Sequence, residues 1–270
     1  MSGIGQSHGC ISVINGIVNG KGSVIGIGLV TEAAYREWDA EPFVKVIGEE
    51  TDDSLARICV RRTLERIGRN PDTGYHLTVR SEIPPSRGLK SSSSVCNAVI
   101  RAVLDAYSVD MDDMEMIKLG VECAKEAKVT VTGSFDDACG CQFGGLIFTD
   151  NYENRVLSRG PVGEYDVVIC TPEYTKRKVP KEEYQAVAPE MEEIQRIAKE
   201  DPLKALTLNG KLIARVTGEG TEVIDRVLEL GALAAGISGT GPAVAVVCEK
   251  GTGKYIAEKL PCDTIVTETR

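Results

Sequence analysis

The chain has 270 residues, enough to bury a large core, and 42% of them are hydrophobic, as in a folded globular protein. Its 31 basic and 40 acidic residues give a net charge of −9 without a long run of like charges. This balance argues against nucleic acid and anionic membranes as partners. We find no charge-free segment of transmembrane length and no basic N-terminal segment followed by a long apolar run, so we expect a cytoplasmic protein.

The nine cysteines are an odd number and are scattered through the predicted strands and helices. This distribution is typical of reduced thiols in the cytosol. Cys139 and Cys141 could form half of a metal site, but no second cysteine pair follows at zinc spacing and both histidines lie far away in sequence. We therefore predict nine reduced cysteines that mainly pack in the core.

The first half of the chain contains both strand and helix patterns. Alternating apolar residues with Asn-Gly turns predict strands over residues 7–29, and a second alternation predicts a strand over 75–80. Apolar spacing of three and four residues, with acidic starts, predicts helices over 52–68 and 110–128, the second capped by Asp110 or Asp112. A boundary between two lobes is expected near residues 158–163.

The second half follows the order strand, helices, paired strands, helix, strand. We predict strands over residues 165–171 and 263–267, a glycine loop that leads into an apolar strand within residues 236–247, and helices over 182–199, 202–216, 221–230 and 254–260. The basic run at 175–181 is either solvent-exposed surface or a contact for an acidic substrate.

The most informative stretch follows the predicted strand 75–80. Pro84 and Pro85 end that strand, Gly88 permits a tight or left-handed turn, and apolar residues at 95–106 recur at helical spacing. The pattern therefore predicts a strand, a glycine turn and a helix.

Four consecutive serines and two cations, Arg87 and Lys90, stand at the start of this predicted helix. A helix N-terminus offers unpaired N–H donors and the positive end of the helix dipole, so this start is a candidate phosphate site. The alternative is an ordinary serine cap on a core helix. Four serines exceed what one cap needs, which favours the phosphate site.

A second informative stretch, residues 132–138, places Asp136 and Asp137 in a predicted loop before a glycine-rich strand at 142–148. Adjacent aspartates usually mark a turn or a cap. Phosphoryl transfer, however, needs a carboxylate that orients or deprotonates a hydroxyl and another that holds Mg²⁺. Glu126, at the end of the preceding helix, provides a further carboxylate.

These motifs resemble the GHMP small-molecule kinases, whose phosphate-binding motif reads Pro-x-x-x-Gly-Leu-Gly-Ser-Ser. Lys90 stands where most members have the second glycine, and the sequence of this stretch is similar to that of the archaeal-type shikimate kinase branch. The resemblance implies an ATP cradle made of Pro84, Pro85, Ser86, Arg87, Gly88, Leu89, Lys90, Ser91, Ser92, Ser93 and Ser94, with Gly239 and Gly241 of a later glycine-rich motif packed beneath it.

The resemblance also implies residue roles. Asp136 matches the aspartate that takes the proton of the acceptor hydroxyl. Mg²⁺ is expected at Ser92 and Glu126, with Ser91 and Glu122 as the alternatives for these two ligands. Cys10 occupies the position where mevalonate-kinase-like members have a lysine, so the resemblance does not support a lysine-assisted mechanism at that position. Lys21 in the following turn is either a substrate contact or, as is more common for a turn lysine, exposed surface.

The implied fold is α+β, a two-lobed GHMP-kinase-like fold with a ferredoxin-like C-terminal lobe. The N-terminal lobe is expected at residues 1–160 and the C-terminal lobe at 161–270. The implied reaction transfers the γ-phosphate of ATP, with Mg²⁺, to a hydroxyl of shikimate, a step of chorismate and aromatic amino-acid biosynthesis. Alternatives are a kinase of homoserine, mevalonate or another small alcohol, and an ATP-binding sensor without catalysis.

Overall fold

The computed structural model describes residues 1–47, 52–130, 133–173 and 179–270. Residue 132 of the predicted acidic loop and residues 175–178 of the basic run lie outside the described residues, so both predictions about them stand as made. Within the described ranges, no helix is long and apolar enough to cross a membrane.

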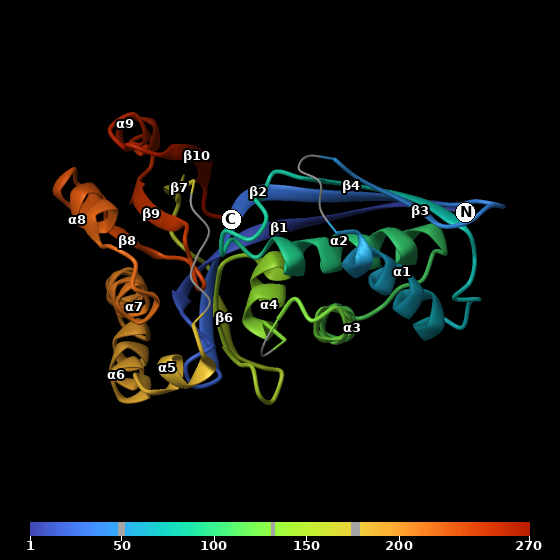
Figure 1. Cartoon of the computed structure of the whole chain (residues 1–270), viewed down its shortest axis with the longest axis horizontal. Helices are drawn as coiled ribbons and strands as arrows, with labels where there is room; N and C mark the ends of the chain where they lie inside the picture. Colours follow the sequence, from blue (N-terminus) through green and yellow to red (C-terminus); the bar gives the residue numbers. More distant parts are fainter. Residues whose placement is uncertain (48–51, 131–132, 174–178) are drawn as a thin grey trace.

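The first part of the described chain forms a six-stranded sheet (Figure 1). The strand order is β3-β4-β2-β5-β6 with β1 paired to β2, and every pair is antiparallel except β3 with β4. The strands are β1 (Ser2–Ile14), β2 (Lys21–Glu37), β3 (Phe43–Ile47), β4 (Tyr75–Ser81), β5 (Leu146–Asp150) and β6 (Arg155–Gly160).

Four helices lie on one side of this sheet, two of them in contact with it and two packed against those helices (Figure 1). Their apolar sides and the inner face of the sheet form one hydrophobic core. Helix α3 begins after Asp112, whose side chain accepts hydrogen bonds from the N–H groups of Met114 and Glu115. The helices are α1 (Ser54–Arg66), α2 (Ser91–Ala106), α3 (Asp113–Glu126) and α4 (Phe135–Phe143).

The second part forms a four-stranded antiparallel sheet in the order β10-β7-β9-β8. Numbered in chain order, the strands follow one another across the sheet as 4-1-3-2, with helices between the first and second strands and between the third and fourth. This is the ferredoxin-like arrangement, and the predicted α+β fold class is confirmed. The elements are β7 (Tyr165–Thr171), α5 (Lys181–Gln185), α6 (Ala188–Ala198), α7 (Pro202–Thr217), α8 (Glu222–Glu229), β8 (Ala234–Ile237), β9 (Val244–Glu249), α9 (Gly253–Ala257) and β10 (Asp263–Glu268).

The β1–β2 hairpin contributes to both hydrophobic cores. Cys10 and Val24 are buried in the core beneath the first sheet, whereas their neighbours Ile11 and Ile25 are buried in the core of the second sheet. Successive side chains of a strand point to opposite faces of the sheet, and here both faces of each strand are buried. The hairpin therefore connects the two sheets, and the division at residue 160 stays a prediction.

Three element predictions are wrong in detail. Asp136 and Asp137 lie in the first turn of helix α4 and not in a loop, and the following strand begins at Leu146 and not at residue 142. The change occurs at Gly144 and Gly145, which both have a φ of 67° and so end the helix. The single helix expected over residues 182–199 is divided into α5 and α6.

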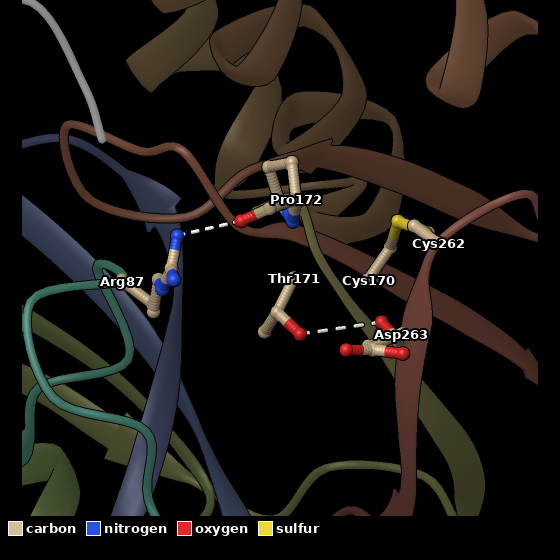
Figure 2. The surroundings of a disulfide bond; sticks show 6 residues. All are labelled: Arg87, Cys170, Thr171, Pro172, Cys262 and Asp263. Atoms are coloured by element: carbon tan, nitrogen blue, oxygen red, sulfur yellow. Dashed lines mark hydrogen bonds between the residues drawn. A yellow bond between two sulfur atoms is a disulfide. The ribbon is translucent and has the colours of Figure 1, made fainter. Parts of the chain in front are cut away.

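The prediction of nine reduced cysteines is also wrong, because Cys170 and Cys262 form a disulfide with a Cα–Cα distance of 6.1 Å (Figure 2). The two residues are 92 positions apart. Pairing of β10 with β7 places Asp263 opposite Thr171 and so brings the two cysteines together. The seven other cysteines are free and buried, in agreement with a packing role.

Reduction of the Cys170–Cys262 disulfide is expected to lower the stability of the oxidised protein by about 2–4 kcal/mol, because the bond closes a long loop in the unfolded chain. The melting temperature should fall by roughly 5–15 °C on addition of a reductant. The Cys170→Ser/Cys262→Ser variant should show no such response. A count of nine reactive thiols in the denatured, unreduced protein would contradict the disulfide; the structure predicts seven.

Candidate active site

A cavity of about 530 Å³ lies where loops from both sheets meet. It is bordered by the β1–β2 turn, the loop over residues 82–90 before α2 (named the phosphate loop after its predicted role), the C-terminal end of α3, the first turn of α4, the residue after β5 and the glycine loop between β8 and β9. The residues that line it are Asn15, Gly16, Ile17, Ser86, Gly88, Leu89, Lys90, Ser91, Ser92, Ser93, Ala124, Lys128, Val129, Thr130, Ser134, Asp136, Asp137, Asn151, Gly239 and Thr240.

The phosphate loop opens into this cavity at the start of α2. Lys90 occupies the cap position with a left-handed backbone (φ 69°), and no side chain of the described residues caps the helix. The first N–H groups of α2 therefore stay available for a ligand, with Ser91, Ser92 and Ser93 beside them. An ordinary serine cap would use one of these N–H groups, whereas here they are left to bind an anion.

Most of the predicted cradle lines the cavity, but some of its members do not. Pro84, Pro85, Ser94 and Gly241 are not among the lining residues. Arg87 also lies outside, and its guanidinium group donates a hydrogen bond to the carbonyl oxygen of Pro172, which ties the phosphate loop to the chain after β7 (Figure 2).

The glycine loop between β8 and β9 packs directly against the phosphate loop. The hydroxyl of Ser238 donates a hydrogen bond to the carbonyl oxygen of Gly88 at 2.9 Å. A Cβ at Gly88 would stand 2.1 Å from the carbonyl oxygen of Ser238, and the φ of 85° at Gly88 also requires glycine. The two loops can approach this closely because Gly88 has no side chain at the contact.

Asp136 is held by Asn151, a residue that the sequence did not reveal. The amide nitrogen of Asn151 donates to Asp136 Oδ1 at 2.9 Å, and its amide oxygen accepts the backbone N–H of Asp136 at 3.0 Å and the hydroxyl of Thr149 at 2.8 Å. An asparagine after a strand normally indicates a turn. Only the packing of α4 against β5 shows its contact with the carboxylate.

Two glycines make room for the same carboxylate. A Cβ at Gly22 in β2 would stand 2.1 Å from Asp136 Oδ2, and one at Gly16 would stand 3.1 Å from it. Burial, together with the charge of Asp137, raises the pKa of Asp136 to about 7, although Lys90 and the hydrogen bond from Asn151 act in the opposite direction. A carboxylate with such a pKa can accept a proton near neutral pH.

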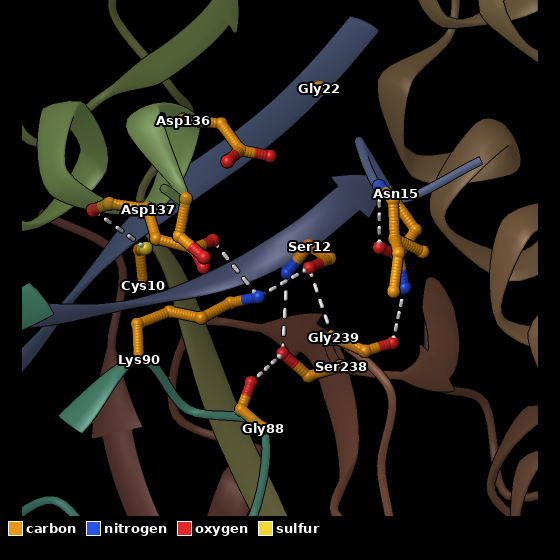
Figure 3. Close-up of polar contacts among 12 residues, drawn as sticks. Cys10, Ser12, Asn15, Gly22, Gly88, Lys90, Asp136, Asp137, Ser238 and Gly239 are labelled. Atoms are coloured by element: carbon orange, nitrogen blue, oxygen red, sulfur yellow. Dashed lines mark hydrogen bonds and ion pairs between the residues drawn. The ribbon is translucent and has the colours of Figure 1, made fainter. Parts of the chain in front are cut away.

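Asp137 contacts a buried lysine. Its Oδ1 lies 3.0 Å from Lys90 Nζ, and that ammonium group also donates to the hydroxyl of Ser12 at 2.9 Å (Figure 3). Burial alone lowers the pKa of Lys90, but the charges of Asp137 and Asp136 outweigh burial and raise it above its ordinary value. Lys90 is therefore a cation at neutral pH.

Glu126 pairs with arginines of α1 and does not line the cavity. Its carboxylate is paired with Arg61 and lies 3.5 Å from Arg62 Nε, and its side chain is 41% exposed. Glu122 contacts Arg62 and Arg66 in the same surface network. Neither glutamate lines the cavity, because both face α1, so the carboxylates available there are Asp136 and Asp137.

Comparison with known proteins agrees with this geometry. Residues 54–145 match the N-terminal domain of the GHMP kinases and residues 190–265 match the GHMP kinase C-terminal domain. A shikimate kinase of Pyrococcus furiosus is 37% identical over 275 residues, which cover 100% of both chains. The chain belongs to the GHMP kinases. A shikimate kinase of Thermococcus kodakarensis is 39% identical and covers 90% of each chain.

Solved structures of GHMP kinases share the fold. The mevalonate kinase of Methanococcus jannaschii superposes with a TM-score of 0.79 at 19% identity, covering 99% of this chain and 98% of its own. A homoserine kinase from Cytophaga hutchinsonii superposes with a TM-score of 0.74 at 17% identity, covering 100% and 94%. The predicted resemblance to this family and to its archaeal shikimate kinase branch is confirmed.

A Gly22→Ala substitution is expected to lower kcat by about 10- to 100-fold, because the added methyl group displaces the Asp136 carboxylate. The KM for ATP should change little. Gly160→Ala is the matched control, since a Cβ there meets no atom within 4 Å. Equal kinetics for both variants would contradict the placement of Asp136 beside β2.

An Asp136→Asn substitution is expected to stabilise the protein at pH 8 by on the order of 1–3 kcal/mol. The folded protein binds the Asp136 proton more tightly than the unfolded chain does, so wild-type stability falls as pH rises from about 4 to about 7. The asparagine removes this loss, and the gain should shrink toward pH 4. Thermal unfolding across this range measures the effect; a gain independent of pH would contradict the raised pKa.

Proposed function

We propose that this protein is a shikimate kinase, which transfers the γ-phosphate of ATP to a hydroxyl group of shikimate. The observation that carries the proposal is the full-length identity of 37% to the Pyrococcus furiosus protein of that name. The cavity supports it, since it combines an anion-binding helix start with a buried carboxylate of raised pKa. The solved mevalonate and homoserine kinases are less than 25% identical and support the fold alone.

The phosphates of ATP are proposed to bind at the N-terminus of α2. The free N–H groups and the hydroxyls of Ser91, Ser92 and Ser93 would donate to phosphate oxygens, and the helix dipole favours their negative charge. The left-handed backbone at Lys90 turns the chain into the helix, so that these donors face the cavity.

Mg²⁺ fits this site as the ion of MgATP. The described residues contain no cluster of three or more carboxylate, histidine or cysteine ligands, which agrees with an ion that keeps several waters and binds mainly through phosphate. Ser92 is the proposed protein ligand, and Glu126 is left out because of its pairing with Arg61. When bound, Mg²⁺ neutralises part of the phosphate charge.

Asp136 is proposed as the general base. The attacking hydroxyl oxygen of the acceptor forms a bond to the γ-phosphorus, the bond between that phosphorus and the leaving oxygen of ADP breaks, and the hydroxyl proton passes to Asp136. The raised pKa suits this transfer. Asn151 holds one carboxylate oxygen, so the other oxygen is left to meet the hydroxyl.

The acceptor is proposed to enter between the β1–β2 turn and α4. Gly16 in that turn lies close to Asp136 Oδ2, and Asn15, Ile17 and Asn151 line the cavity there. The turn is fixed by the second part of the chain, because Asn15 donates its backbone N–H to the side-chain oxygen of Asn209 in α7 and its amide to the carbonyl oxygen of Gly239 in the loop after β8. Residues of both parts thus form the proposed acceptor site.

The function is tested by ADP release from MgATP with shikimate, homoserine and mevalonate supplied separately at equal concentration. We expect turnover with shikimate and none with the other two alcohols, and phosphorus NMR should show one new phosphomonoester. Turnover with homoserine or mevalonate but not with shikimate would overturn the substrate while keeping the kinase. Nucleotide binding without turnover on any of the three would favour a sensor.

Asp136→Asn is expected to lower kcat by about 10²- to 10⁴-fold with little change in nucleotide affinity, because the variant cannot accept the proton. Asp113→Asn is a suitable control: Asp113 is an exposed acid of α3 outside the cavity lining and should leave kcat within about twofold. Near-normal turnover by a folded Asp136→Asn protein would remove Asp136 from the mechanism.

A further inference from the structure

The ammonium group of Lys90 is largely buried, although Lys90 itself lines the cavity. The side chain is 7% exposed. Its Nζ contacts two groups of this chain, Asp137 Oδ1 at 3.0 Å on α4 and Ser12 Oγ at 2.9 Å on β1 (Figure 3). The ammonium group thus donates a hydrogen bond to Ser12 and forms an ion pair with Asp137.

The neighbouring carboxylates explain why a cation is needed there. Asp136 and Asp137 are adjacent, and the side chain of Asp137 is only 14% exposed. Two carboxylates beside a phosphate site repel each other and the incoming nucleotide, and a buried carboxylate without a partner costs several kcal/mol. When both carboxylates are ionised, Lys90 reduces the charge of this group from −2 to −1.

The same ammonium group links three elements. Ser12 Oγ accepts a hydrogen bond from Lys90 and another from the backbone N–H of Gly239 at 3.0 Å. Asp137 is therefore connected through Lys90 and Ser12 to the glycine loop of the second sheet. Since Asp136 precedes Asp137 in the first turn of α4, a displacement of Asp137 also displaces Asp136.

We infer that Lys90 is a positioning residue, which fixes Asp137 and thereby Asp136 at the cavity, and that it is not a ligand of the ATP phosphates. The inference rests on the proposed function for the role of Asp136. It changes the role implied by the resemblance, in which Lys90 belongs to the ATP cradle. A phosphate ligand would need its ammonium group directed at the helix start, whereas this group faces Asp137 and Ser12.

The test is a double-mutant cycle between Lys90→Met and Asp137→Asn, with kcat, nucleotide dissociation constants and thermal unfolding measured for all four proteins. MgADP and a non-hydrolysable MgATP analogue serve as the nucleotide probes, and binding is measured without acceptor. Lys90→Met is expected to lower kcat by about 10²-fold and to change both dissociation constants by less than about threefold. The double variant should be no less active than Lys90→Met, because the two changes remove one interaction.

Lys128→Met is the matched control, because Lys128 is the other lysine that lines the cavity within the described chain. Its effects and those of Asp137→Asn should simply add. If Lys90→Met destabilises the fold through an unpaired Asp137, the double variant removes both charges and should recover the melting temperature, which tests the pair without any activity assay.

Two results would overturn the inference. One is a loss of nucleotide affinity of tenfold or more in Lys90→Met that persists in the double variant, which would make Lys90 a phosphate ligand. The other is full additivity of Lys90→Met and Asp137→Asn in stability and in kcat. Failure of the proposed function gives a different result: the wild-type protein would not phosphorylate shikimate. The stability and nucleotide-binding measurements would still decide the role of Lys90.

Discussion

The site depends on one electrostatic constraint, the burial of two adjacent carboxylates next to the place where ATP phosphates are proposed to bind. The negative charge of Asp137 is paired with the ammonium group of Lys90. Asp136 has a raised pKa, and Asn151 is the one side chain of the described residues that donates a hydrogen bond to its carboxylate. Asp137 is thus bound in an ion pair, whereas Asp136 can exchange a proton. The proposed chemistry follows from this division, because a base that titrates near neutral pH needs a desolvated and incompletely neutralised carboxylate.

This arrangement costs stability at the site, and the fold compensates elsewhere. The β1–β2 hairpin is buried in two hydrophobic cores, and the phosphate loop contacts the glycine loop of the second sheet through Gly88 and Ser238. Gly22 and Gly16 have no side chains, and this leaves space for the Asp136 carboxylate. The site therefore combines a rigid frame with a locally unfavourable charge, which is a common feature of active sites.

Local sequence patterns predicted the features that depend on local structure. The strand, turn and helix around Ser91 follow from periodicity and turn residues. The ferredoxin-like lobe was implied by the family resemblance, and the predicted succession of elements agreed with it. Contacts between distant residues were not predictable in this way: Asn151 beside Asp136, Ser12 beneath Lys90 and the Cys170–Cys262 pair all arise from strand pairing and packing. Glu126 illustrates the same limit, since helical position alone does not reveal that the arginines of α1 bind it.

The central claim is that one cavity holds the phosphates at the start of α2 and the acceptor hydroxyl at Asp136. A crystal structure of the protein with shikimate, Mg²⁺ and a non-hydrolysable ATP analogue tests it most directly. The account predicts a shikimate hydroxyl within hydrogen-bonding distance of an Asp136 carboxylate oxygen, the γ-phosphate between that hydroxyl and the Ser91–Ser93 amides, and Lys90 still paired with Asp137. Shikimate bound away from Asp136, or phosphates bound away from α2, would contradict it.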